Sequence, residues 1–167
     1  MGDSKNKVEN LNQAAMIQAV KKAMDEELRA AEFFEKVMNR TVDPGAKKMF
    51  KQLAAFQRQH VQHLDFALKS IDGGELGEPT RARFRIIRPD TPPVDLTEVQ
   101  IKTDIEALEV GIEAQKKRQA TYLDLSFLAT TPSVAAFFKN LADEEKRHLE
   151  MLEEQYLSIK NSGKYTW

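Results

Sequence analysis

The sequence contains no cysteine among its 167 residues. This absence excludes disulfide bonds, thiolate metal sites, iron–sulfur clusters and cysteine nucleophiles. Any metal bound by this chain therefore needs oxygen and nitrogen ligands, which carboxylate and imidazole side chains supply.

The chain also has little net charge and no long apolar run. Its 26 acidic and 25 basic residues leave a formal charge of −1, so no overall field attracts nucleic acid or a membrane surface. No apolar run approaches the roughly 20 residues of a membrane-spanning helix. The first residues, MGDSKNKVENLNQ, lack the apolar core of a signal peptide. We therefore expect a cytoplasmic protein without nucleic-acid or membrane partners.

Glycine and proline are scarce, and they gather in one stretch. Of seven glycines and six prolines, three and four respectively fall within residues 72–96, which cannot be helical throughout. A stretch of this length suits the long crossover of a four-helix bundle whose second and third helices run parallel. Its segment RARFRII alternates arginine with apolar residues. This alternation favours either a loop packed by its apolar side chains or a basic docking surface for an acidic partner.

Four segments on either side of this stretch carry apolar residues at helical spacing. Two of them begin with proline after a residue suited to capping, in Asp43-Pro44 and Thr131-Pro132. We predict helices over residues 11–39, 44–71, 97–129 and 132–160. The whole chain, residues 1–167, is then a single all-α domain.

The two halves of the chain repeat each other at an offset of 88 residues. FKQLAAFQRQHVQHL and FKNLADEEKRHLEML are two versions of one helix, and His60 falls on His148. The offset predicts two helical hairpins, duplicated and joined by the crossover. Other matched pairs are Pro44 with Pro132, Phe34 with Tyr122, Phe50 with Phe138 and Leu64 with Leu152.

The same offset collects polar residues on the inward faces of the predicted helices. One glutamate from each of two helices, with a Glu-x-x-His pair from each of the others, is the ligand set of a di-iron or di-manganese carboxylate centre. Hard divalent iron and manganese favour carboxylate oxygen together with imidazole. The six candidate ligands are Glu27, Gln57, His60, Gln115, Glu145 and His148.

The motifs EELRAAEFF, LAAFQRQH, GIEAQKKRQATY and LADEEKRH resemble the rubrerythrin branch of the ferritin-like superfamily, over roughly residues 15–157. The resemblance implies a ferritin-like four-helix bundle that forms a homodimer. It also implies peroxide reduction, iron oxidation or iron handling at the bundle site. Classical members carry a cysteine-rich rubredoxin domain that supplies electrons. Because this chain has no cysteine, a redox cycle would need an external electron donor.

Two glutamates of the family pattern are glutamines in this chain. Gln57 and Gln115 stand where the family has glutamate ligands, and the other four candidate ligands match the family. A neutral amide is a poorer ligand than a carboxylate for a hard cation. Family geometry leaves one nearly complete site, formed by Glu27, His60 and Glu145. The sequence thus predicts one iron or manganese ion per chain, or none.

Arg118 separates two interpretations of the site, because the family has a glutamate at this position. If Arg118 turns inward, its guanidinium pairs as a fork with Glu27 and Glu145 and replaces the missing metal. The protein is then a metal-free bundle with a structural or partner-binding role. If the side chain instead runs outward along the helix, the site stays open for metal.

Other polar residues near these motifs have structural explanations. His63 matches Met151 in the repeat, so we expect it at the surface or outside the ligand shell. We expect Glu26, Asp143 and Glu144 on the solvated faces of their helices.

Overall fold

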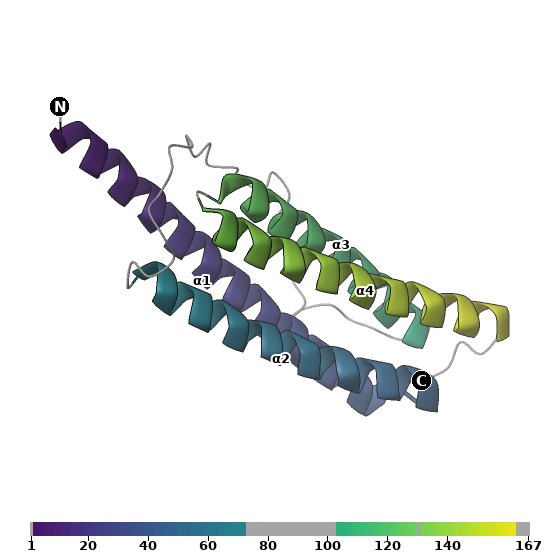
Figure 1. Ribbon diagram of the computed structural model, residues 1–167. Coiled ribbons are helices and arrows are strands. Elements are labelled where there is room, and N and C mark those ends of the chain that lie inside the picture. The colour runs from purple at the N-terminus through teal and green to yellow at the C-terminus, as the bar shows by residue number, and fades with distance from the viewer. Residues whose placement is uncertain (1, 73–102, 130, 163–167) are drawn as a thin grey trace.

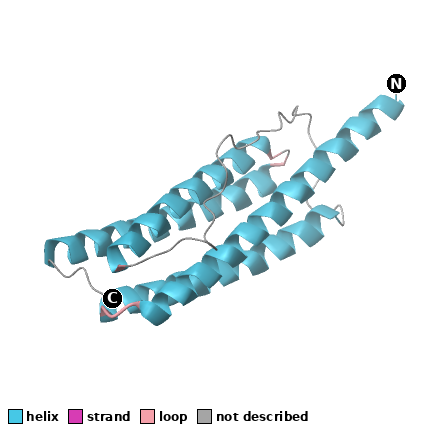
Figure 2. Ribbon diagram, turned by 180° about the vertical axis from the view of Figure 1, so that it is seen from behind, coloured by secondary structure: helices cyan, strands magenta, loops and turns pink. Residues whose placement is uncertain are grey.

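The computed structural model describes residues 2–72, 103–129 and 131–162, with side chains for residues 13–71, 103–129 and 131–162. Four helices run side by side as a bundle (Figure 1), seen from behind in Figure 2. The helices are α1 Gly2–Arg40, α2 Pro44–Asp72, α3 Asp104–Leu128 and α4 Pro132–Ser162. Within these residues there is no strand, so the predicted all-α four-helix bundle is confirmed.

The bundle consists of two helical hairpins. α1 packs mainly on α2, and α3 packs mainly on α4. The colours of Figure 1 show that α2 and α3 run in the same direction, as a long crossover between them requires. The repeated hairpins are thereby confirmed. The crossover itself, including RARFRII, lies outside the described residues.

Side-chain caps begin three of the helices. The Asp43 carboxylate accepts a hydrogen bond from the backbone N–H of Ala46 at 2.8 Å, just ahead of Pro44. The Thr131 hydroxyl similarly accepts from the N–H of Val134 at 3.4 Å. Such bonds satisfy N–H groups that have no partner within the helix.

Two helix starts differ from the sequence prediction. α3 begins at Asp104, where the Thr103 hydroxyl accepts from the backbone N–H of Glu106 at 3.2 Å. The predicted start near residue 97 lies outside the described part. α1 begins at Gly2, well before Leu11. The periodicity of apolar residues misses this first stretch, because the segment is mostly polar and shows no apolar stripe, although it also contains no proline to break a helix. No described helix is both long enough and apolar enough to span a bilayer.

The apolar core consists of two clusters that the repeat relates. One contains Phe34 and Phe50, and the other contains Tyr122 and Phe138; each of these side chains is at most 1% exposed. In every helix the candidate ligands fall between the residues of one cluster and those of the other. The two apolar clusters therefore enclose a polar layer across the middle of the bundle.

Gly111 lets α3 approach its neighbours beside this layer. A Cβ atom at Gly111 would lie 3.3 Å from Phe34 Cε1 and 3.3 Å from Leu152 Cδ2, closer than ordinary van der Waals contact. These atoms belong to α1 and α4. The glycine therefore permits close packing of α3 against its hairpin partner α4 and against α1 of the other hairpin. Because Gly111 is flanked by helix on both sides, this packing offsets the low helix propensity of glycine.

We predict that Gly111→Val lowers the free energy of unfolding by about 1–3 kcal/mol, because the added side chain would overpack the core. Gly111→Ala should be nearly neutral, since better helix propensity offsets the closer contact. Ala120→Val, at an exposed position of α3, is the control for valine in this helix. Urea unfolding of the three variants measures the effect. Equal stability of Gly111→Val and Ala120→Val would contradict the close packing.

Candidate metal centre

The polar layer holds all six candidate ligands in the interior. They come from all four helices, and none of them is more than 5% exposed. Buried polar groups are costly unless hydrogen bonds, opposite charges or a metal compensate for them. Each group in the layer therefore requires a compensating contact.

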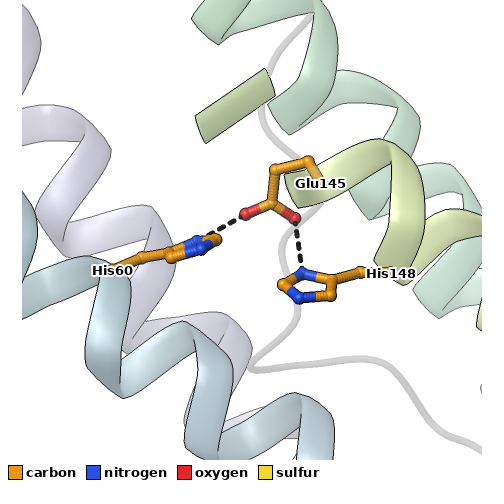
Figure 3. A group of neighbouring side chains, drawn as sticks. All are labelled: His60, Glu145 and His148. Carbon is orange, nitrogen blue, oxygen red and sulfur yellow. Dashed lines mark hydrogen bonds and ion pairs between the residues drawn. The ribbon is translucent and has the colours of Figure 1, made fainter. Parts of the chain in front are cut away.

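The Glu145 carboxylate lies between two imidazole rings (Figure 3). His60 Nδ1 is 2.8 Å from Glu145 Oε1, and His148 Nδ1 is 3.4 Å from Glu145 Oε2. The two imidazole centroids are 5.5 Å apart. α2 thus supplies one histidine, and one turn of α4 supplies the other histidine together with the carboxylate.

These three side chains fit a single metal ion. One donor atom from each of His60, Glu145 and His148 lies within 4.8 Å of the others. Metal–ligand bonds of about 2.0–2.2 Å place neighbouring donors roughly 3–4 Å apart, so small side-chain shifts suffice. Among the described residues, no hydrogen bond of good geometry reaches the buried Glu145 Oε1, despite the nearby His60 nitrogen. Two imidazoles and one carboxylate with open positions suit divalent iron.

Glu27 is held by other partners. The Tyr122 hydroxyl donates a hydrogen bond to Glu27 Oε1, and His60 Nδ1 lies 3.4 Å from the same oxygen. Tyr122 is buried in the core, and its hydroxyl also has this polar function. The three donors that the structure groups together include His148 and omit Glu27. This grouping differs from the surviving site that family geometry suggested.

Arg118 turns inward. Its side chain is 6% exposed, and Nε lies 3.8 Å from Glu27 Oε2 and 3.8 Å from Glu145 Oε2. These separations are too long for hydrogen bonds. Arg118 Nε and one terminal nitrogen have no hydrogen-bond partner among the described residues. The planar fork that the inward alternative included therefore does not form, and Arg118 acts on the two carboxylates through its charge.

The two glutamines connect α2 and α3 to Glu145. Gln115 Nε2 donates a hydrogen bond to Glu145 Oε2, and Gln57 Nε2 donates to Gln115 Oε1 at 3.4 Å. A glutamate at either position could not donate in this way unless it were protonated. The amide of Gln115 therefore stabilises the charged form of Glu145 without a second metal ion.

The surroundings separate the pKa values of the two carboxylates. Burial, followed by the charge of Glu145, raises the pKa of Glu27 to about 7. Burial would also raise the pKa of Glu145, but the adjacent imidazoles of His148 and His60 and the charge of Arg118 hold that pKa well below its usual range. Glu145 is therefore the anion of the layer over a wide pH range.

His60 is the second cation of the layer when no metal is bound. Burial alone would lower its pKa, but the close contacts with the carboxylates of Glu145 and Glu27 and the charges of these residues raise it to about 10. With His60 protonated, Arg118 and His60 balance the formal charges of Glu27 and Glu145.

Sequence reasoning missed the contacts of two residues at the edge of the layer. Glu144 was expected on a solvated face, but its Oε2 lies 2.8 Å from His60 Nε2, and its side chain is only 36% exposed. Phe56 stacks on His148 with ring centroids 4.8 Å apart. The repeat gave a signal for these contacts. Phe56 and Glu144 are matched at the offset of 88 residues, and each directly precedes a candidate ligand.

The remaining expectations concern the outer residues. Asp143 is exposed as expected. Glu26 is half-buried and lies 3.8 Å from Lys22 Nζ. His63 is half-buried with its ring centroid 6.4 Å from that of His60, which places it outside the group of three donors.

Comparison of the sequence with models of protein families and with curated proteins finds no match. Comparison of the structure with solved structures finds similar folds. A hypothetical protein from Pyrococcus furiosus has a TM-score of 0.70 at 18% identity, over 87% of this chain and 90% of that one. A two-domain protein from Anabaena variabilis, containing DJ-1/ThiJ/PfpI-like and ferritin-like domains, has a TM-score of 0.66 at 17% identity.

The match to the Anabaena protein covers 89% of this chain but only 38% of that protein. The matched part corresponds to the ferritin-like domain, because the described residues of this chain form four helices and no strand. Identities below one in five support a statement about architecture alone. The chain has the ferritin-like fold.

Proposed function

We propose that this protein binds one divalent transition-metal ion, iron or manganese, at His60, Glu145 and His148. The observation that carries the proposal is the convergence of one donor atom from each residue within 4.8 Å in the interior. Buried carboxylate and imidazole donors in a bundle core are the usual construction of such sites. Glu27 lies beside these donors as a further carboxylate, held by Tyr122.

One ion fits this layer better than two. The second half of a symmetric site would use Gln115 and the glutamate position now taken by Arg118. Instead, the amide of Gln115 donates to Glu145, and the Arg118 guanidinium adds a fixed positive charge near both carboxylates. A second dication beside this guanidinium would be repelled and would have fewer anionic ligands.

The proposed activity is iron handling or iron oxidation, in a cytoplasmic homodimer that uses an external redox partner. One iron ion supplies one electron on oxidation from the divalent to the trivalent state, whereas reduction of peroxide to water takes two. A single-ion site therefore supports iron binding and oxidation more directly than peroxide reduction.

A second candidate function is a metal-free bundle with a structural or partner-binding role. The position of Arg118 supports it, because Arg118 and protonated His60 already balance Glu27 and Glu145. A buried layer with balanced charges needs no ion to remain folded. Metal content separates this candidate from the first.

We predict about one Mn²⁺ or Fe²⁺ per chain after anaerobic loading and desalting, measured by elemental analysis. His148→Ala should abolish retention, because it removes one of three ligands and leaves Glu145 with its other partners. His63→Ala, an outer histidine, should retain about one ion per chain. Two ions per chain in the parent would contradict the single-ion proposal, and none would favour the metal-free candidate.

A second experiment restores the lost ligands. Gln57→Glu with Gln115→Glu should leave the ratio near one ion per chain, because the Arg118 charge remains. Adding Arg118→Glu to these two changes should raise the ratio toward two, since it exchanges a cation for an anion at the second half-site. The same elemental analysis measures the ratio. A rise to two in the double variant would show that Arg118 does not oppose a second ion.

The charge role of Arg118 predicts a pH-dependent effect on stability. In the presence of chelator, Arg118→Ala should lower the free energy of unfolding by on the order of 3 kcal/mol at pH 7.5, because two buried carboxylates lose a cation. The loss should be smaller at pH 5.5. Glu27, with its pKa raised to about 7, is protonated there and no longer needs the arginine.

Urea unfolding of the parent and Arg118→Ala at both pH values measures this difference. Lys116→Ala is the matched control, since it removes an exposed cation from the same helix and should change stability little. An equal loss at pH 7.5 and pH 5.5 would mean that Arg118 stabilises the bundle by packing and not by charge.

A further inference from the structure

We propose that Glu144 is a positioning residue for His60, and that it makes His60 the better-oriented of the two histidine ligands. The inference rests on the proposed function, because it concerns the same metal site. It adds a residue that lies outside the six candidate ligands and whose side chain contacts the ligand His60.

The two nitrogens of the His60 ring face different carboxylates. Nδ1 lies 2.8 Å from Glu145 Oε1 in the interior, and Nε2 lies 2.8 Å from Glu144 Oε2 at the edge of the layer. An N–H at Nε2 that donates to Glu144 leaves the lone pair of a neutral imidazole on Nδ1, directed at the site. A carboxylate in this outer position fixes ring orientation and raises the basicity of the ligating nitrogen.

Glu144 is suited to this task by its place on α4. Its other oxygen, Oε1, lies 3.9 Å from the Arg147 guanidinium one turn later, which leaves Oε2 for His60. Its side chain is 36% exposed, whereas those of His60 and Glu145 are at most 2% exposed. Glu144 therefore keeps contact with solvent while it holds a buried ring, which lowers the cost of bringing a third carboxylate to the site.

The matched position in the other hairpin cannot act in the same way. Phe56 stacks on the His148 ring at an interplanar angle of 12° and has no acceptor atom. The repeat thus brings a carboxylate to one histidine and an apolar ring to the other. The formal charges agree with this asymmetry, because Glu27, Glu145 and Glu144 together balance Arg118 and one divalent ion.

The test is a titration of metal-depleted protein with Mn²⁺ or Co²⁺, comparing Glu144→Ala with the parent. Loss of an outer carboxylate should weaken binding by roughly 10–100-fold. Asp143→Ala is the matched control, because it removes the same charge from an exposed neighbour and should bind like the parent. Glu144→Gln should recover part of the affinity, since its amide oxygen still accepts from His60 Nε2–H.

A fourth variant moves the carboxylate to the other hairpin. Phe56→Glu in the Glu144→Ala background places an acceptor beside His148 and should restore part of the affinity. The Co²⁺ absorption spectrum of each variant reports the ligand geometry, which a general loss of stability would not change selectively. Urea unfolding in chelator identifies any variant that is simply unfolded, and Glu144→Gln then carries the comparison.

The outcomes separate the inference from the function on which it rests. A parent that binds no ion overturns both the proposed metal site and the role of Glu144. A parent that binds one ion, with Glu144→Ala binding as tightly as Asp143→Ala, overturns the role of Glu144 alone. Equal weakening by Glu144→Ala and Asp143→Ala would also overturn it, because the effect would then be one of general surface charge.

Discussion

Two carboxylates are buried in one layer, and the other residues of the centre must compensate their negative charge. Glu27 and Glu145 are both fully buried, and the charge of Glu145 raises the cost of ionising Glu27. Arg118, His60, Tyr122 and Gln115 all contribute charge or hydrogen bonds to these two groups. The apolar clusters on either side exclude water and thereby strengthen each of these interactions.

Much of the fold could be predicted from the sequence. The positions of the helices depend on residue spacing and on capping residues, which do not change with side-chain conformation. Apolar spacing predicted four helices, proline and capping residues predicted two of the helix starts, and the offset of 88 residues predicted the paired hairpins. The same offset matched Gln57 with Glu145 and His60 with His148, and all four side chains lie in the buried layer. The early start of α1 was missed because its first residues are mostly polar in sequence and form no apolar stripe.

The contacts inside the centre were less predictable, since they depend on rotamers that tertiary packing selects. The sequence left both directions of Arg118 open, and the structure turns it inward at distances that favour charge over hydrogen bonding. Glu144 stands among charged residues that are typical of a solvated helix face, yet its side chain extends from α4 to His60 on α2. A polar residue at the edge between two hairpins can face solvent or contact the other hairpin. The sequence is the same in both cases, and only the packing of the hairpins decides between them.

The inward position of Arg118 affects the order in which the protein assembles. Structural zinc domains remain unfolded until the ion arrives, because their ligands cannot otherwise be brought together. Here a covalently attached cation is already beside the buried carboxylates, so the bundle can complete its folding on newly made chains before any metal is delivered. Under the proposed function, an arriving ion would compete with ion pairs that are already formed, so the same ligands would bind it more tightly if Arg118 were absent.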